Sequence, residues 1–319
     1  MTADPVFSLA GRRVFVAGHR GMVGAALVRR LASEDCQVLA ASRAELDLTR
    51  QAEVERWMAD QRPDVVICAA ARVGGIEANN SFPVEFLAEN LAISLNLIRA
   101  CHAVGVAKLL YLGSTCIYPK NSAQPMREDQ LLTGPLEPTN EWYAVAKIAG
   151  IKLCQAYRRQ FGCDFISVMP TNLYGPGDNY DPVSSHVVAA LIRRCHDAKW
   201  ANAPAVTVWG TGTPRREFMH VDDLADACVF LLGHYSAAEI INAGVGRDVT
   251  IAGFARLVAN VVGYTGDLAF DPSKPDGTPR KLVDVTRLTA LGWTASTPLE
   301  QGLAQTYRSF LETHGSGSR

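Results

Sequence analysis

The chain has 319 residues, of which 48% are hydrophobic and 20% are charged, and its formal net charge at neutral pH is −1. This length is enough for one large or two modest domains with a sizeable core. The near-neutral charge excludes a broad basic surface for nucleic acid or anionic lipid.

The sequence shows neither a recognisable targeting signal nor cysteines at C-x-x-C spacing. No apolar run approaches the ~18–20 residues that cross a bilayer, and residues 1–11 lack the basic-then-apolar pattern of a secretory signal. The eight cysteines are scattered without a C-x-x-C pair, which favours reduced thiols over a disulfide framework or a zinc site. We therefore expect a cytoplasmic protein with no metal, membrane or nucleic-acid partner.

Short apolar or β-branched runs alternate with longer segments of helical period in the first half of the chain. The predicted strands cover 13–17, 37–41, 65–69, 109–112 and 165–169, and the predicted helices cover 23–32, 51–61, 86–102 and 143–161. This alternation predicts an α/β fold with a Rossmann-like, doubly wound parallel sheet. Such sheets bind ligands beyond the carboxyl ends of their strands, so catalytic residues should follow the strands.

From about Gly175 the sequence becomes rich in Gly, Pro, Asn and Asp, a composition typical of loops. We expect residues 1–175, together with about 216–249, to form the first lobe, with a helix over 221–232. Residues 176–215 and 250–319 should form a smaller, discontinuous second lobe. The last five residues, 315–319, are expected to be a flexible tail.

A glycine-rich segment follows the first predicted strand and precedes a predicted helix. Its spacing is G-x-x-G-x-x-G rather than the usual G-x-G-x-x-G. Glycines let the backbone approach a pyrophosphate, and the helix amino terminus favours its negative charge. We interpret the segment as a dinucleotide site, and a simple tight turn is the alternative. Its residues are Gly18, His19, Arg20, Gly21, Met22, Val23 and Gly24.

The end of the second predicted strand indicates which dinucleotide is bound. About twenty residues after the glycines, an NAD-specific protein would carry Asp or Glu for the ribose 2′-hydroxyl. This chain carries Ser42-Arg43, and the fork of donors on arginine suits a phosphate. We therefore predict NADP(H), with Arg20 as a second cation. A solvent-facing Arg43 is the alternative.

Tyr143 and Lys147 lie four residues apart on a predicted helix and so share one face. Ser114 follows the fourth predicted strand. A serine hydroxyl can hold a carbonyl oxygen, and a tyrosine can protonate it. The Lys147 ammonium is expected to lower the phenol pKa and to bond the nicotinamide ribose. The alternative is a pair without function, because an isolated Y-x-x-x-K spacing more often lies on a solvated face of a helix.

Together, the glycine segment, Arg43 and the Ser-Tyr-Lys set resemble the extended short-chain dehydrogenase/reductase superfamily. Longer strings resemble the GDP-L-fucose synthase family almost from end to end; they cover 19–24, 71–76, 116–120, 137–141, 170–175, 208–210, 216–223 and 274–281.

This resemblance implies a bifunctional enzyme that epimerises GDP-4-keto-6-deoxy-D-mannose at C3 and C5 and then reduces its C4 ketone with NADPH. In the family a thiol and an imidazole share the epimerisation, and Cys116 and His186 match them here. The sequence does not show which of the two is the base. The alternative to these catalytic roles is that Cys116 is simply a buried thiol and His186 a surface histidine. Relatives commonly dimerise through helices equivalent to 86–102 and 143–161, so a homodimer is expected.

The resemblance also implies binding residues. The second lobe would bind the GDP-sugar through Arg194, Trp209, Arg216, Asp276 and Lys281. A solvated helix end is the alternative for Arg194, and a core aromatic for Trp209. The further cofactor contacts would be Ala69, Ala70, Ala71, Leu112, Gly113, Ser114, Thr115, Lys147, Pro170, Thr171, Asn172, Leu173 and His186.

Two other functions are alternatives for this sequence. A different nucleotide-sugar epimerase or dehydratase could use the same scaffold, although a dehydratase would carry an acidic residue near Ser114, where this chain has none. A non-catalytic NADP-sensing protein would have lost part of the Ser-Tyr-Lys set, which is intact here.

Overall fold

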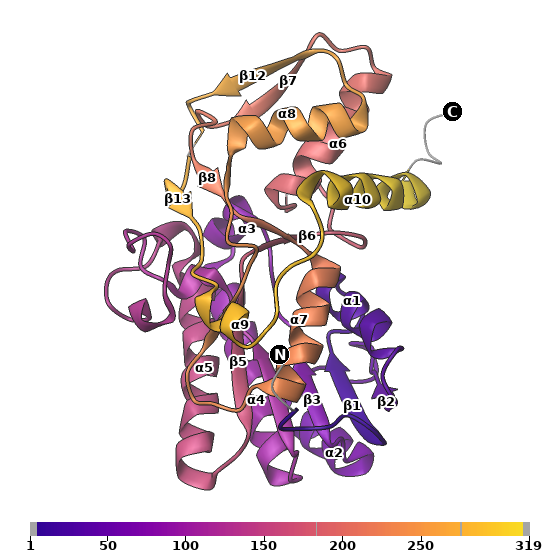
Figure 1. Cartoon of the computed structure of the whole chain (residues 1–319), viewed down its shortest axis with the longest axis vertical. Helices are drawn as coiled ribbons and strands as arrows, with labels where there is room; N and C mark the ends of the chain where they lie inside the picture. Colours follow the sequence, from indigo (N-terminus) through magenta and orange to yellow (C-terminus); the bar gives the residue numbers. More distant parts are fainter. Residues whose placement is uncertain (1–4, 183, 275, 315–319) are drawn as a thin grey trace.

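The computed structural model describes residues 5–182, 184–274 and 276–314. The tail predicted at 315–319 therefore lies outside the described residues. Figure 1 shows a larger lobe built on a sheet and, above it, a smaller lobe that contains α6 (Val187–Trp200), α8 (Ile251–Val262) and α10 (Leu299–His314).

The larger lobe contains a six-stranded, fully parallel sheet with the order β10-β5-β4-β3-β1-β2. This sheet confirms the predicted Rossmann-like α/β fold. The strand order reverses at β1, which has β2 on one side and β3 on the other, so the segment after β1 lies where such sheets bind ligands. The strands are β1 (Arg12–Ala17), β2 (Cys36–Leu39), β3 (Val65–Cys68), β4 (Lys108–Leu112), β5 (Phe165–Pro170) and β10 (Ile241–Ala243).

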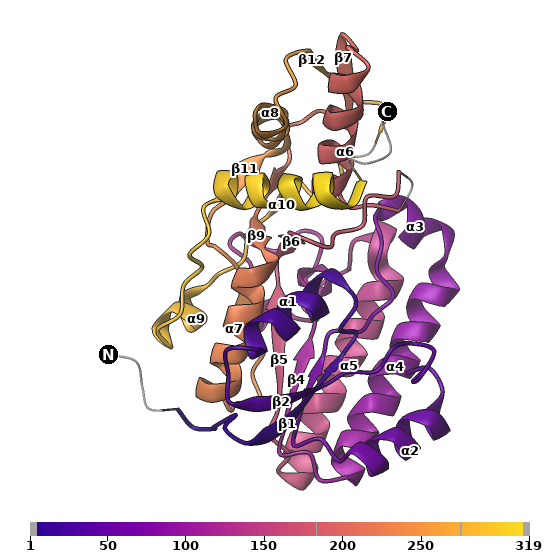
Figure 2. The same ribbon diagram turned by 90° about the vertical axis from the view of Figure 1, so that its right-hand side faces the viewer.

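Helices cover both faces of this sheet (Figure 2). Successive strand residues point to opposite faces, so Val14 and Val16 pack in one apolar cluster with α1 and α7, whereas Phe15 and Ala17 pack in the other with α2, α4 and α5. The predicted helices are all present, with small shifts of their ends. Their bounds are α1 (Met22–Leu31), α2 (Gln51–Gln61), α4 (Pro83–Ala103), α5 (Glu141–Phe161) and α7 (Val221–His234).

A third apolar cluster lies in the smaller lobe, among α6, α8, α10 and β7 (Ala205–Trp209). β7 pairs with β12 (Asp267–Asp271). The Gly- and Pro-rich composition indicated loops here, but it did not reveal these three helices, whose apolar residues recur at helical spacing.

Short elements connect the two lobes. A three-stranded sheet contains β11 (Val249–Thr250), β8 (Arg215–Arg216) and β13 (Arg280–Lys281), and a parallel pair contains β6 (Asn172–Tyr174) and β9 (Phe218–His220). Leu288 of α9 (Thr286–Ala290) packs in the α1–α7 cluster of the larger lobe. The remaining elements are α3 (Ile76–Ser81), η1 (Thr115–Ile117), η2 (Glu128–Gln130) and η3 (Pro138–Asn140).

Among the described residues, the helices lack the combination of length and apolar character that a bilayer crossing requires.

Candidate active site

The glycine segment after β1 packs directly against the backbone that follows β3. Gly18 has a φ of +86°, and a Cβ added there would lie 2.8 Å from the backbone N and Cα of Ala70. A Cβ on Gly24 would overlap the Gly18 carbonyl oxygen. Gly21 is the N-cap of α1, whose first turn has no acidic residue and no side-chain cap. The free N–H groups and the open backbone fit a dinucleotide phosphate.

The segment that carries Arg43 lies beside the glycine segment. Ser42 is buried, and both its N–H and its hydroxyl donate to the Glu45 carboxylate at 2.7 Å. These bonds, followed by the charges of Arg20 and His19, lower the pKa of Glu45, so the two segments are neighbours. The Arg43 side chain is 72% exposed, with its guanidinium 3.8 Å from Glu89. An exposed arginine at this place is accessible to a phosphate.

Ser114, Tyr143 and Lys147 meet at the carboxyl end of β4. Ser114 is the N-cap of η1, and its Oγ accepts from the Cys116 N–H at 3.4 Å. Lys147 is buried in α5, where its Nζ donates to the Leu112 carbonyl at 2.8 Å and lies 5.7 Å from the centre of the Tyr143 ring. The shared helix face predicted from the sequence is thus directed at the strand end.

The ionisation of this set differs from the prediction. Burial raises the pKa of Tyr143, and negative charge on Cys116 or Cys68 would raise it further. Burial also lowers the pKa of Lys147. The pKa of Tyr143 is therefore raised and not lowered as expected, because desolvation by burial disfavours the phenolate. Tyr143 is a protonated phenol at neutral pH.

Cys116 and His186 both lie near Lys281. Cys116 is buried; burial raises the pKa of its thiol, and a hydrogen bond with Ser114 and the positive charge of Lys281 oppose that rise. His186 is the N-cap of α6, and burial, followed by the charge of Lys281, lowers its pKa. The structure thus brings the predicted thiol and imidazole to one ammonium beside the Ser-Tyr-Lys set.

Solvent exposure of His186 limits how far burial lowers its pKa. The residue is exposed to solvent, although protein surrounds it closely enough for burial to be the leading cause of the lowered pKa. Water in this open site screens the ring and limits the shift. A substrate that displaced this water would lower the pKa further.

Lys281 and Arg216 begin a strip of polar residues that leads into the smaller lobe. Lys281 of β13 pairs in register with Arg216 of β8. Arg216 Nη2 donates to the Asp276 carbonyl at 3.2 Å, and the Asp276 carboxylate accepts from the Thr211 N–H at 2.8 Å. Asp276 therefore connects Arg216 to the turn that follows Trp209.

Trp209 is the outer end of this strip and presents a flat surface between two cations. Trp209 is 47% exposed. The guanidinium carbon of Arg194 lies 5.0 Å from the centre of the Trp209 ring, and the Nζ of Lys274 lies 5.3 Å from the same point. The alternative of a core aromatic is wrong, because the ring lies at the surface. An exposed indole flanked by cations can stack on a base and attract a diphosphate.

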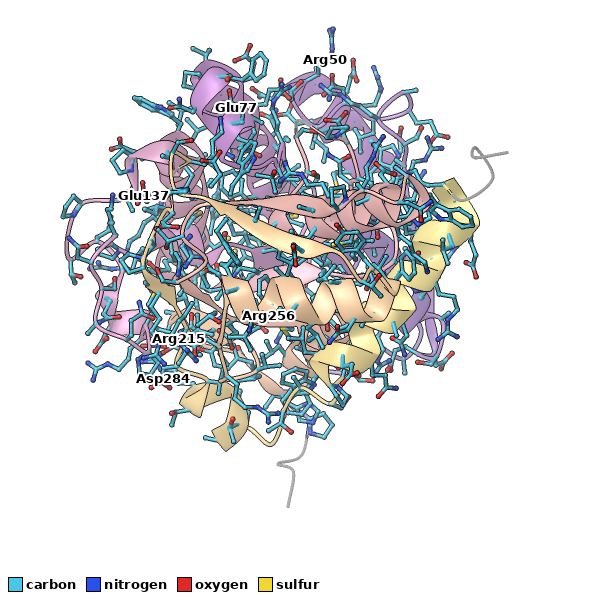
Figure 3. The ribbon with its side chains drawn as sticks, turned by 90° about the horizontal axis from the view of Figure 1, so that it is seen from above. Arg50, Glu77, Glu137, Arg215, Arg256 and Asp284 are labelled. Carbon is cyan, nitrogen blue, oxygen red and sulfur yellow. The ribbon has the colours of Figure 1, made fainter. Side chains whose placement is uncertain are left out.

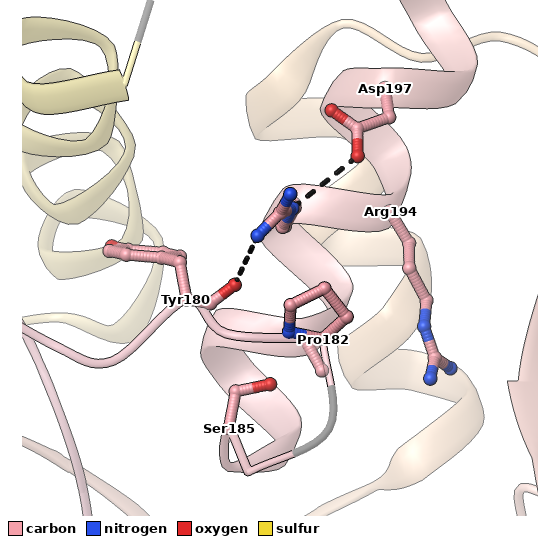
Figure 4. Close-up of a pocket in the computed structure, with 7 residues that line it drawn as sticks. Tyr180, Pro182, Ser185, Arg194 and Asp197 are labelled. Atoms are coloured by element: carbon pink, nitrogen blue, oxygen red, sulfur yellow. Dashed lines mark hydrogen bonds and ion pairs between the residues drawn. The ribbon is translucent and has the colours of Figure 1, made fainter.

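The two adjacent arginines of α6 face different surroundings (Figure 4). Arg193 donates to the Tyr180 carbonyl at 2.8 Å and lies 3.6 Å from Asp197, whereas the Arg194 side chain points away from this pair. All four residues line a cavity of about 120 Å³. Ligand sites for small molecules typically occupy ~300–1,000 Å³, so this cavity can hold only part of a nucleotide sugar.

The other predicted cofactor contacts lie at the ends of three neighbouring strands. Residues 69–71 follow β3, residues 112–115 end β4 and follow it, and residues 170–173 end β5 and continue into β6. Because carboxyl ends of parallel strands share one edge of a sheet, the three segments lie along the same edge as the glycine segment, and the residues after β3 pack against it. Their contacts with a dinucleotide stay a prediction.

Sequence reasoning did not select two residues that belong to this arrangement, Lys274 and Glu137. Glu137 is buried, lies 3.1 Å from the Lys120 Nζ, and acts electrostatically on Arg216 and Lys281. Both residues fall within the strings that carried the family resemblance. Their positions within these strings could have indicated both residues, but the sequence does not show where their side chains point.

Known proteins resemble this chain in sequence and in fold. The model of the NAD dependent epimerase/dehydratase family matches residues 14–244. A GDP-L-fucose synthase of Sinorhizobium fredii is 58% identical over 96% of this chain and 98% of that relative. A GDP-L-fucose synthase of Escherichia coli is 54% identical over 95% of this chain and 98% of that relative. The crystal structure of a GDP-L-fucose synthetase from Naegleria fowleri bound to NADP superposes with a TM-score of 0.91 at 28% identity, covering 100% of each chain.

Proposed function

Because this chain belongs to the NAD dependent epimerase/dehydratase family, we propose that it converts GDP-4-keto-6-deoxy-D-mannose to GDP-L-fucose. The enzyme would epimerise C3 and C5 and then reduce the C4 ketone with NADPH. Relatives of 54–58% identity carry the name of that activity. The single structural observation that supports it most is that the charge of Lys281 acts on both Cys116 and His186, while Cys116 is hydrogen-bonded to Ser114 and acts electrostatically on Tyr143.

Epimerisation needs a proton to leave a carbon beside the ketone and to return on the opposite face of the sugar ring. The hydroxyls of Ser114 and Tyr143 would donate to the C4 oxygen and stabilise the enolate that forms. Cys116 and His186 would exchange the carbon-bound protons. Burial, only partly opposed by Lys281, raises the pKa of Cys116, so its thiol can donate a proton, whereas the lowered pKa of His186 leaves a neutral imidazole that can accept one.

Reduction would use the same oxygen contact. NADPH, when bound, supplies the hydride that C4 receives. Tyr143, which its raised pKa keeps protonated, would give its proton to the C4 oxygen as negative charge develops there. Lys147, held against the Leu112 carbonyl, would bond the cofactor ribose and position it beside the ketone.

The substrate would lie along the strip from Lys281 to Trp209. Arg194 and Arg216 would bind the diphosphate, since guanidinium groups pair well with phosphate oxygens. Trp209 would stack on the guanine. We therefore propose that residues 176–215 and 250–319 form the substrate-binding domain, and that residues 1–175 with about 216–249 form the NADP-binding domain.

We also propose that the protein is a cytoplasmic homodimer. In the described part of the chain the eight cysteines are unpaired, as in a reducing compartment. Helices α4 and α5 lie side by side (Figure 1) and expose the apolar side chains of Leu95, Trp142 and Val145, which are 45%, 43% and 39% exposed. Exposed apolar side chains on paired helices fit a subunit interface.

The purified protein can be tested by adding GDP-4-keto-6-deoxy-D-mannose and NADPH and following the loss of NADPH absorbance. We expect oxidation of NADPH and formation of GDP-L-fucose, identified by chromatography and NMR. No oxidation with this substrate would contradict the proposal and favour another GDP-keto-sugar or a sensing role.

A further inference from the structure

The segment Val73–Gly74–Gly75, which follows β3, touches the backbone that leads to His186. The Gly75 N–H donates to the Ser184 carbonyl at 3.1 Å. A Cβ added to Gly75 would lie 2.9 Å from the Ser185 carbonyl oxygen, which is closer than real Cβ atoms approach. Gly75 has φ −65° and ψ −179°, a conformation that any residue adopts. The glycine is therefore required by the space beside Ser185 and not by its dihedral angles.

Asn79 holds Gly74 and Gly75 within the larger lobe. Its side chain is buried, and its Nδ2 donates to the Gly74 carbonyl at 2.8 Å and to the Gly75 carbonyl at 3.0 Å. The next residue, Asn80, is exposed. Asn79 lies on α3, which packs against η3, the turn that precedes α5 and Tyr143. In the view from above, Glu77 of α3 and Glu137, just before η3, are labelled on the same side of the molecule (Figure 3).

His186 lies immediately beyond this contact. Ser184 and Ser185 precede it, and α6 begins at the next residue, with the Ala190 N–H donating to the His186 carbonyl at 2.9 Å. Figure 2 shows α3 beside the connection that enters α6. The Gly75–Ser184 bond thus joins a segment of the larger lobe to the first residues of the smaller lobe, at the place where the imidazole must be aligned with Cys116.

We propose that Gly75, held by Asn79, is a positioning residue for His186. The contact sets the position of the imidazole relative to the sugar ring and so controls epimerisation without contributing to the binding of NADPH. This inference rests on the proposed role of His186 in epimerisation. A misplacement of about 1 Å can cost ~100-fold in rate when a reacting group must be aligned, and the methyl group of Gly75→Ala would push the Ser185 backbone away by part of that distance.

Solvent deuterium exchange into GDP-4-keto-6-deoxy-D-mannose, followed by mass spectrometry without NADPH, measures epimerisation chemistry alone. We expect Gly75→Ala to slow this exchange at least tenfold and to leave the KM for NADPH within twofold. Gly233→Ala is the matched control, because its added Cβ would lie 3.7 Å from the Phe7 carbonyl oxygen, an ordinary contact remote from the site. It should leave both quantities unchanged.

A second pair of variants covers the case in which Gly75→Ala does not fold, as judged by circular dichroism. Asn79→Ala should slow the exchange, whereas Asn80→Ala should not. Unchanged exchange in every folded variant at Gly75 and Asn79 would overturn the inference.

The double variant with His186→Asn separates a positioning role from a general loss of structure. If Gly75 acts through His186, Gly75→Ala will add no further slowing in the His186→Asn background. Additive losses, or a KM for NADPH that rises together with the loss of exchange, would contradict this. No exchange by the unaltered protein would defeat the proposed function and this inference together, whereas normal exchange by that protein and by Gly75→Ala would defeat the inference alone.

Discussion

Tyr143 shows how surroundings set the role of a single side chain. Its raised pKa keeps the phenol protonated, so the proton can pass only to a stronger base such as the alkoxide that hydride transfer creates. We expect Tyr143→Phe to lower the rate of NADPH oxidation by at least ~100-fold, since general acids contribute ~10²–10⁴-fold. NADPH binding, measured by fluorescence titration, should change little because the ring is retained. Oxidation at more than a tenth of the normal rate would exclude Tyr143 as the proton donor.

The role of Cys116 can be tested with a substitution that changes the size of the side chain little. We expect Cys116→Ser to slow deuterium exchange into the keto sugar at least tenfold, because a serine hydroxyl ionises far less readily than a thiol. NADPH binding should stay normal, which fluorescence titration can check. An unchanged exchange rate would remove the thiol from the mechanism.

Arg43 is expected to select the cofactor. Arg43→Ala should raise the KM for NADPH at least tenfold and the KM for NADH less than twofold, since only NADPH carries the 2′-phosphate. Arg50→Ala is the matched control, because Arg50 is as exposed as Arg43 and lies near Asp47 and Glu53. Equal effects of Arg43→Ala on both cofactors would refute the assignment.

At the scale of elements, a buried charge cluster joins β4, β5 and α5 at the end of the sheet opposite the site. Lys108 of β4 is fully buried, and its Nζ donates to Asp164 at 2.8 Å and to the Tyr235 carbonyl at 2.6 Å. Arg158 of α5 donates to Asp164 at 2.7 Å. Burial lowers the pKa of Lys108, and the hydrogen bond and charge of Asp164 oppose that shift.

We expect Asp164→Asn to lower the free energy of unfolding at pH 7 by about 2 kcal/mol, somewhat below the value for a fully buried pair because Asp164 retains some exposure. Burial opposes ionisation of Asp164, yet hydrogen bonds from Lys108, Arg158 and Ser236 hold its pKa below the usual value. This stabilisation is therefore present above the unfolded pKa of about 4 and is lost as pH falls through the folded pKa. Urea unfolding at pH 7 and in acid should show the difference shrinking, and a constant difference would contradict this account.

At the scale of the whole molecule, subunit association can be tested through α4. Leu95→Glu would place a charge in the proposed interface, so we expect it to convert the dimer to a monomer by light scattering after gel filtration. Leu311→Glu, at a residue of α10 that is 38% exposed, is the matched control and should leave the dimer intact. A monomeric unaltered protein, or a dimeric Leu95→Glu protein, would rule out this interface.

Residue order alone predicts the features that depend on short stretches of chain. The glycine segment, the alternation of strands and helices and the shared face of Tyr143 and Lys147 follow from steric needs and periodicity within a few residues. The three-residue strand β10 is not predicted, because so short a strand gives a weak pattern. The helices of the smaller lobe are not predicted either: their apolar residues recur at helical spacing, but the Gly- and Pro-rich connections around them indicated loops.

The effects of distant residues on one another arise from the folded structure and not from local sequence. The high pKa of Tyr143 arises from desolvation by the packed fold, and Lys281 reaches both Cys116 and His186 from the far end of the chain. The Gly75–Ser184 contact likewise joins segments of different lobes. Such effects depend on distance and on the exclusion of water, which the order of residues along the chain does not contain.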